Sequence, residues 1–218
     1  MKKLTVFGLV LALGLSAIAA GCSEKSPQTD TPQSGSQEAA GKSWSSAPAM
    51  SIDQNRTYQA VFETDKGKFS VDLFTKEAPV TVNNFVFLAE QNYYDGVKFH
   101  RIMQDFMIQS GDPTGTGRGG PGYTIEDELN SPYTYEPGIV AMANKGIAHT
   151  GGSQFFICTG ESSKSLDNKP NFTIFGKVSA GMDVVQELAA APVTANSQGE
   201  MSVPLQDVLI QNITIVKN

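Results

Sequence analysis

Two short stretches of the chain carry side chains suited to acting on a neutral peptide. The first, residues 99–111, combines the guanidinium of Arg101 with the primary amide of Gln109 and several large apolar side chains. The second, residues 151–157, is polar at its start and aromatic at its end. Arginine stays charged and offers several N–H donors in one plane, so it can polarise an amide without any bond being broken. We therefore predict Arg101 and Gln109 as catalytic residues.

Four motifs resemble those of the cyclophilin family of peptidyl-prolyl cis-trans isomerases. In chain order they are FHRIMQDFMIQSGD at 99–112, PGIVAMAN at 137–144, GGSQFFI at 151–157 and FTIFGKV at 172–178. The resemblance extends over residues 56–218. It implies a mainly β fold, a closed eight-stranded antiparallel barrel capped by two α-helices. It also implies an enzyme that accelerates rotation about X–Pro bonds, with Arg101 as the donor to the prolyl nitrogen.

The resemblance further implies how the substrate is bound. An apolar pocket for the proline ring is expected. Beside it, the resemblance implies residues that bind the backbone of the peptide, and a second pocket next to these residues. The implied substrate-binding residues are Phe106, Met107, Ala143, Asn144, Gln154, Phe156, Leu166 and Phe172. Two positions differ from the family pattern: Ser165 stands where a Trp is frequent, and Phe172 where a His is frequent. The rim of the proline pocket should therefore match the family less closely than its floor.

Hydrophobic periodicity predicts the elements that must position these side chains. Alternation over residues 58–64 and 68–73 predicts a hairpin, and a 3.6-residue period predicts helices over 79–89 and 181–190. Further strands are predicted at 97–103, 106–111, 139–143, 154–159, 172–177 and 207–216. Eight strands with two separated helices exclude a doubly wound sheet, which alternates strand and helix. A closed barrel is favoured because it removes the edges of such a sheet.

The N-terminus predicts export. Lys2 and Lys3 precede an apolar run over residues 4–20, and small residues follow, which is typical of a signal peptide at 1–21. An uncleaved membrane anchor is the alternative, although the run is short for a spanning helix.

Cys22 follows Ala19-Ala20-Gly21, a sequence that resembles a bacterial lipobox, in which the thiol is lipidated. The resemblance predicts a lipoprotein that is extracytoplasmic and lipid-anchored to the bacterial cell membrane. Two alternatives remain: cleavage by an ordinary signal peptidase, and a disulfide between Cys22 and Cys158. Residues 22–55 are rich in Ser, Gln, Thr, Pro and Gly, and we expect a disordered linker there. Trp44 lies in this linker and is assigned no function.

Composition excludes several other functions. The chain has 22 acidic against 16 basic residues and a net charge of −6, so no nucleic-acid partner is expected. With only two histidines, neither a metal site nor a cofactor is predicted.

The glycine-rich residues 115–120 are followed by Pro121 where a dinucleotide-binding helix must begin, so they are interpreted as a flexible loop. Ser153 does not lie in a nucleophile elbow, so a Ser-His-Asp hydrolase is not predicted. The acidic residues 126–128 are interpreted as a solvated loop, with a calcium site as a weaker alternative.

These observations predict a monomeric prolyl isomerase that acts on proline-containing segments of exported proteins while they fold. A peptide-binding chaperone or adaptor on the same fold is the alternative. A pure binder has no need of a charge directed at the amide nitrogen, so Arg101 favours the enzyme. A solute-binding lipoprotein is disfavoured because such proteins generally need two lobes around a cleft.

Overall fold

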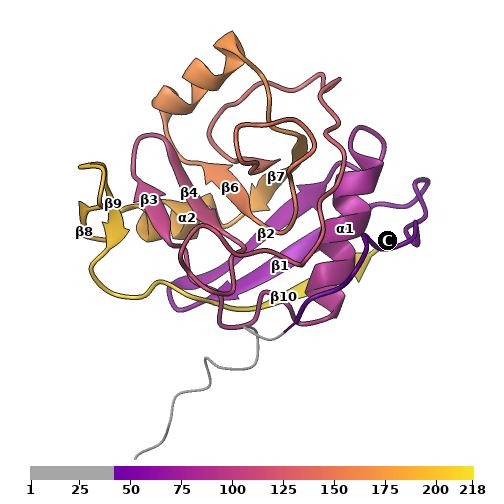
Figure 1. Cartoon of the computed structure of the whole chain (residues 1–218), viewed down its shortest axis with the longest axis horizontal. Helices are drawn as coiled ribbons and strands as arrows, with labels where there is room; N and C mark the ends of the chain where they lie inside the picture. Colours follow the sequence, from indigo (N-terminus) through magenta and orange to yellow (C-terminus); the bar gives the residue numbers. More distant parts are fainter. Residues whose placement is uncertain (1–41) are drawn as a thin grey trace, which may run out of the picture. The chain divides into compact units, whose positions relative to one another are not determined.

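The computed structural model describes residues 42–218, so the predicted signal peptide and Cys22 lie outside the described residues. Its largest feature is one antiparallel sheet of eight strands in the order β10-β1-β2-β7-β5-β6-β4-β3 (Figure 1). The strands are β1 (Tyr58–Thr64), β2 (Gly67–Leu73), β3 (Arg101–Met103), β4 (Met107–Ser110), β5 (Ile139–Met142), β6 (Phe155–Cys158), β7 (Ile174–Ala180) and β10 (Ile210–Lys217). A separate hairpin of β8 (Val193–Ala195) and β9 (Met201–Pro204) was not predicted. The eight strands predicted from the sequence are all present.

The sheet is strongly curled but is not the closed barrel that the sequence predicts. Its edge strands are β3 and β10, and they do not pair with each other along their lengths. An isolated bridge between Lys98 and Leu209 joins the segments before these strands, and the amide of Phe99 donates to the carbonyl of Val208 at 2.9 Å. Because β3 is short and its free side lies beside β9, the edges remain open beyond that bridge.

Within the described part of the chain, three helices accompany the sheet. The predicted helices are confirmed as α1 (Pro79–Glu90) and α2 (Met182–Ala189), and a 3₁₀ helix, η2 (Glu161–Asn168), was not predicted. Pro79 suits the first turn of α1 because proline lacks the amide hydrogen that would have no partner there. Within residues 42–218, no helix is long and apolar enough to cross a bilayer.

The first turn of α1 is capped by a carboxylate from a distant loop. Glu128 accepts hydrogen bonds from the amides of Val80 at 3.0 Å and Thr81 at 2.9 Å. A negative charge at this position satisfies amides that have no partner within the helix and interacts favourably with its dipole. The acidic residues 126–128 are therefore not simply a solvated loop, because Glu128 has this structural role.

Alternation along the strands divides the apolar side chains into two clusters. Phe155 faces the inside of the curl, where both α-helices bury their apolar sides. Phe156, its neighbour in the chain, faces the outer side with Met107 and Ala141. Successive side chains of a strand point to opposite faces, so one strand supplies both the main core and a second, smaller cluster. The candidate site lies over this outer cluster.

The N-terminal arm, residues 42–55, differs from the disordered linker predicted there. Trp44 lies in contact with two aromatic rings, Phe87 at 5.2 Å and Tyr93 at 5.8 Å between centroids. Its amide donates to the carbonyl of Pro121 at 2.8 Å. The arm is thus attached to the domain through both the indole and the backbone of Trp44.

A hydrogen bond and a close backbone approach also fit the arm to the domain. The side-chain oxygen of Asn83 in α1 accepts a hydrogen bond from the amide of Ser51 at 2.8 Å. At Gly122, with φ +92°, any side chain would collide with Ser43 and Trp44, and glycine tolerates this backbone conformation where other residues are strained. The sequence did not indicate this packing, because the arm has few large apolar residues and their partners are remote in the chain.

Candidate active site

The two predicted catalytic residues, Arg101 and Gln109, lie in a row of paired residues that crosses four strands. Strand pairing places Arg101 of β3 opposite Gln109 of β4, Gln109 opposite Phe156 of β6, and Phe156 opposite Ala141 of β5. Residues paired in this way project from the same face of a sheet. The pairing therefore brings the guanidinium, the amide and an aromatic ring together on the outer face, from segments that are far apart in the sequence.

A cavity of about 310 Å³ opens beside this row. It is lined by nine of the ten residues predicted for catalysis and substrate binding: Arg101, Phe106, Met107, Gln109, Ala143, Asn144, Phe156, Leu166 and Phe172. Met107 and Phe156 are almost fully buried and form its apolar floor. The tenth residue, Gln154, borders the adjoining cavity.

Phe172 is fixed at the rim by a residue that the sequence did not indicate. Its ring stands perpendicular to that of Phe156, with centroids 5.3 Å apart. The hydroxyl of Tyr135 donates to the Phe172 carbonyl at 2.6 Å and accepts from the Phe172 amide at 3.1 Å. Burial raises the pKa of Tyr135 to about 12, so the hydroxyl keeps the proton that it donates.

The guanidinium of Arg101 is held by a carboxylate that was also missed. Its Nε donates to Oε1 of Glu200 at 2.8 Å and its Nη2 to Oε2 at 2.7 Å. The hydrogen bond from Arg101 is the main cause that lowers the pKa of Glu200 to about 2, so this carboxylate is charged at ordinary pH. Glu200 lies in a polar stretch far from any motif, and the sequence gives no signal for this pairing.

Gln109, the second predicted catalytic residue, is paired with another amide and not with Arg101. Its Nε2 donates to Oε1 of Gln154 at 2.9 Å. Gln154 in turn donates to the carbonyl of Gly119 at 2.9 Å. This chain of amides separates the first cavity from the adjoining one of about 630 Å³, and Ala143 and Asn144 line both.

Asn144 presents backbone groups at this junction. Its side chain is occupied, because Nδ2 donates to the carbonyl of Asn171 at 2.7 Å. Within residues 42–218, its backbone N–H and C=O make no hydrogen bond. An extended peptide lying across both cavities can use these two groups.

Comparisons with known proteins show the family of the chain. Residues 59–215 match the sequence profile of the family described as cyclophilin type peptidyl-prolyl cis-trans isomerase/CLD. The chain belongs to this family. It is therefore an isomerase of X–Pro peptide bonds.

Its relatives include eukaryotic proteins. Peptidyl-prolyl cis-trans isomerase-like 1 of Emericella nidulans is 44% identical over 160 residues, covering 72% of this chain and 93% of the fungal protein. The human peptidyl-prolyl cis-trans isomerase-like 3 is 43% identical over 159 residues, covering 71% of this chain and 94% of the human protein. A cyclophilin-type isomerase from Cryptosporidium parvum has a solved structure with a TM-score of 0.66 and 31% identity, covering 74% of this chain and 99% of that one.

In this cyclophilin the glycine-rich loop is ordered around a buried carboxylate. Asp112 is fully buried and accepts hydrogen bonds from the backbone amides of Thr114, Thr116, Arg118 and Gly119 at 2.8 to 3.1 Å. Burial alone would raise the pKa of Asp112, but hydrogen bonds from the hydroxyl of Thr114 and from the amides of Gly119 and Thr114 hold it below its ordinary value. The loop predicted as flexible is therefore a fixed wall of the larger cavity.

Ser165, predicted at the rim of the proline pocket, does not line the cavity beside Arg101. It belongs to η2, is exposed, and its hydroxyl donates to the carbonyl of Ser162 at 2.7 Å. It lines a separate open cavity together with Phe106 and Met201. Among residues 42–218, no group of three or more His, Cys, Asp or Glu side chains could hold a metal ion.

Proposed function

We propose that Arg101 accelerates isomerisation by donating a hydrogen bond to the prolyl nitrogen of the substrate. Rotation about an X–Pro bond faces a barrier of roughly 18–20 kcal/mol because the amide is conjugated, and it takes tens to hundreds of seconds unaided. A donor near the nitrogen favours its pyramidal, deconjugated form, which occurs only close to the transition state. An interaction that is stronger in the transition state than in the ground state is what raises the rate.

The observation that carries this proposal is the position of the inner edge of the guanidinium, formed by Nη1 and Nη2. Nη1 lies 3.8 Å from the sulfur of Met107 and Nη2 lies 3.3 Å from the sulfur of Met103. Thioether sulfur is a weak acceptor, so these donors lose little when a substrate amide replaces it. Met107 also lines the floor of the pocket, which supports a position for the prolyl ring beside these donors.

The apolar pocket supports a prolyl substrate. Met107 and Phe156 offer a buried apolar floor, and a pyrrolidine ring presents apolar surface that is better removed from water. The related Cryptosporidium parvum isomerase, with a TM-score of 0.65 and 31% identity, was also crystallised in the presence of the dipeptide Ala-Pro. We propose that proline-containing segments of unfolded proteins bind here, with their backbone on Asn144.

A proline-isomerisation assay of the full-length protein tests this role. We expect Arg101→Ala to lower kcat/KM by roughly 10²–10³, about 3–4 kcal/mol, as for the loss of one preorganised charged donor. Arg56→Ala is the matched control, because Arg56 contacts the carbonyl of Asn218 and lines neither cavity. Undiminished turnover in folded Arg101→Ala would refute the role of Arg101. Peptide binding without turnover by the wild type would favour the peptide-binding chaperone.

We also propose that the protein is a lipoprotein, anchored outside the cytoplasm through Cys22, and that it assists the folding of exported proteins. The charged start, apolar run and lipobox-like residues before Cys22 support this. Cys22→Ser should move the protein from the membrane fraction to the soluble fraction without changing its isomerase rate. Cys158→Ala, which alters a thiol buried in β6, should stay in the membrane fraction. A Cys22→Ser variant that remains membrane-bound would instead indicate an uncleaved anchor.

A further inference from the structure

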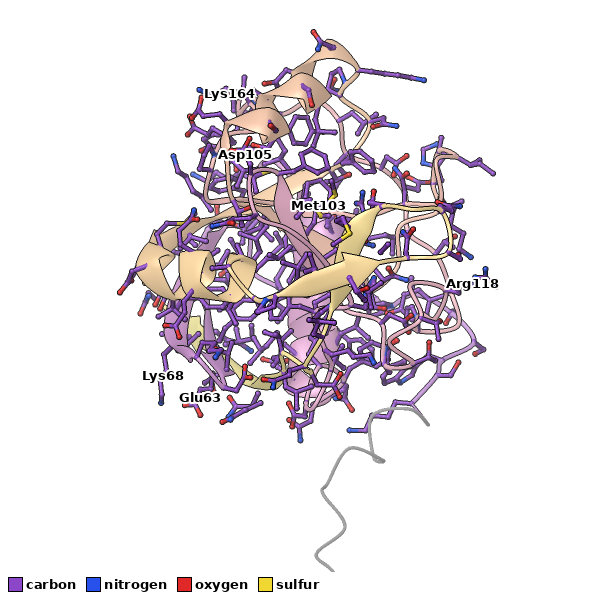
Figure 2. The ribbon with its side chains drawn as sticks, turned by 90° about the vertical axis from the view of Figure 1, so that its left-hand side faces the viewer. Glu63, Lys68, Met103, Asp105, Arg118 and Lys164 are labelled. Carbon is purple, nitrogen blue, oxygen red and sulfur yellow. The ribbon has the colours of Figure 1, made fainter. Side chains whose placement is uncertain are left out.

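The hairpin of β8 and β9 brings a carboxylate onto the outer face of the main sheet. Figure 2 shows this hairpin in yellow across the face on which Met103 is labelled. Glu200, beside the start of β9, binds Arg101 through both carboxylate oxygens, at 2.8 and 2.7 Å. Both side chains are about one-third exposed, at 33% and 31%, so the pair lies at the edge of the pocket and not in the deep core.

Glu200 binds one edge of the guanidinium and leaves the other available. The carboxylate takes Nε and Nη2 in a two-point contact, which fixes the plane of the group as well as its position. The inner edge, Nη1 and Nη2, then faces the sulfurs of Met107 and Met103. The strong acceptor thus binds one edge of the guanidinium, and the acceptors at the other edge are two thioether sulfurs.

The turn of the hairpin is built so that Glu200 has a defined position. The side-chain oxygen of Asn196 accepts from the amides of Gln198 at 2.8 Å and Glu200 at 3.0 Å. The amide of Asn196 also donates to the carbonyl of Glu200 at 2.8 Å. Gly199, at φ +84°, provides the left-handed backbone that closes the turn. The carboxylate is therefore presented by an ordered turn.

We propose that Glu200 is a positioning residue for isomerisation, which holds Arg101 in the plane that directs its inner edge at the prolyl nitrogen. This inference rests on the proposed role of Arg101 as the donor. A free arginine side chain has many rotamers, and a donor that must be ordered during the reaction stabilises the transition state less than a preorganised one. Gln109 does not supply this support, because it is paired with Gln154.

The test is a set of substitutions in the full-length protein, with kcat and KM measured separately. Glu200→Ala should lower kcat on the order of tenfold and leave KM nearly unchanged, because the donor is displaced while the pocket is intact. Glu200→Gln, which keeps one acceptor, should lie between the wild type and Glu200→Ala. Glu136→Ala is the matched control: it removes a carboxylate that is paired with Lys177 at 2.7 Å and lines neither cavity, and it should keep the wild-type kcat.

A double-mutant cycle separates this inference from the proposed function. If Glu200 acts through Arg101, then Glu200→Ala should cause no further loss in an Arg101→Ala background. If Arg101→Ala is impaired but Glu200→Ala keeps full kcat, the positioning role is wrong and the donor role stands. A rise in kcat in Glu200→Ala would also overturn it, since the carboxylate would then be restraining the donor. Wild-type activity in Arg101→Ala would overturn the donor role itself. If Glu200→Ala does not fold, Glu200→Gln alone must show reduced kcat.

Discussion

At the residue scale, the guanidinium of Arg101 divides its hydrogen bonds between one strong acceptor and two weak ones. The carboxylate of Glu200 binds the outer edge, and the sulfurs of Met103 and Met107 face the inner edge. Bonds between ionised partners are roughly twice as strong as neutral ones. Under the proposed donor role, the substrate amide competes only with the thioethers, while the ion pair with Glu200 holds the guanidinium in place.

The charges near Arg101 predict how the rate depends on pH. The pKa of Glu200 is about 2, mainly because of its hydrogen bond with Arg101, so the ion pair is lost only when the pH falls toward that value. Burial lowers the pKa of His100, the neighbour of Arg101 in the chain, below its ordinary 6.5, so this imidazole is neutral above that pH. We therefore expect kcat/KM to be flat between about pH 6.5 and 8.5. An inflection in that range, measured at constant ionic strength, would show that another group titrates in the site.

At the element scale, β6 serves two separate purposes with two adjacent side chains. Phe155 lies in the inner core, edge-to-face with Phe85 at 5.8 Å between centroids, while Phe156 forms the pocket floor. We expect Phe155→Leu to lower the free energy of unfolding by about 1–2 kcal/mol without changing kcat/KM. Phe156→Leu should lower kcat/KM several-fold, because about 1 kcal/mol of apolar contact with the prolyl ring is lost.

Urea unfolding and the isomerase assay, run on both β6 variants, check this division. The two positions are matched controls for each other, since the substitution and the strand are the same. Equal loss of activity in both variants would contradict the assignment of Phe155 to the core alone.

Local sequence was sufficient to predict most elements. Alternation identified β1 and β2, which bury one face each. The other strands of the main sheet and both α-helices were also predicted, although β5 and β6 are buried on both faces. The four family-like motifs also contain most of the residues that line the pocket. The 3₁₀ helix η2 and the β8–β9 hairpin were missed, because their short polar segments have no clear period. The closed barrel was wrong because β3 is only three residues long, which the sequence motif does not indicate.

At the scale of the whole molecule, the N-terminal arm extends the folded region beyond the residues that the family profile matches. That profile begins at residue 59, whereas Trp44 already packs on Phe87 and Tyr93. Such long-range contacts cannot be predicted from composition: the arm is as polar as a linker, and its few apolar groups find partners only in the folded domain. The pairing of Glu200 with Arg101 was missed for the same reason.

The arm can be followed directly, because Trp44 is the only tryptophan of the chain. We expect its fluorescence to shift to the emission of exposed indole in the same urea transition that far-UV circular dichroism reports. Trp44→Ala should lower the free energy of unfolding by about 1–3 kcal/mol, since a partly buried indole is removed, and Trp44→Phe by less. Loss of the fluorescence signal well before the sheet unfolds would mean that the arm detaches independently and contributes little.

The central claim is that Arg101 stabilises the transition state of rotation and not the bound peptide. Its most direct test is the cis–trans exchange rate of an Ala-Pro peptide while bound, measured by NMR exchange spectroscopy in the wild type and in Arg101→Ala. The claim predicts an exchange rate on the enzyme that falls on the order of a hundredfold, with peptide affinity changed only a few-fold. An unchanged exchange rate with weakened binding would contradict it, because Arg101 would then only hold the substrate.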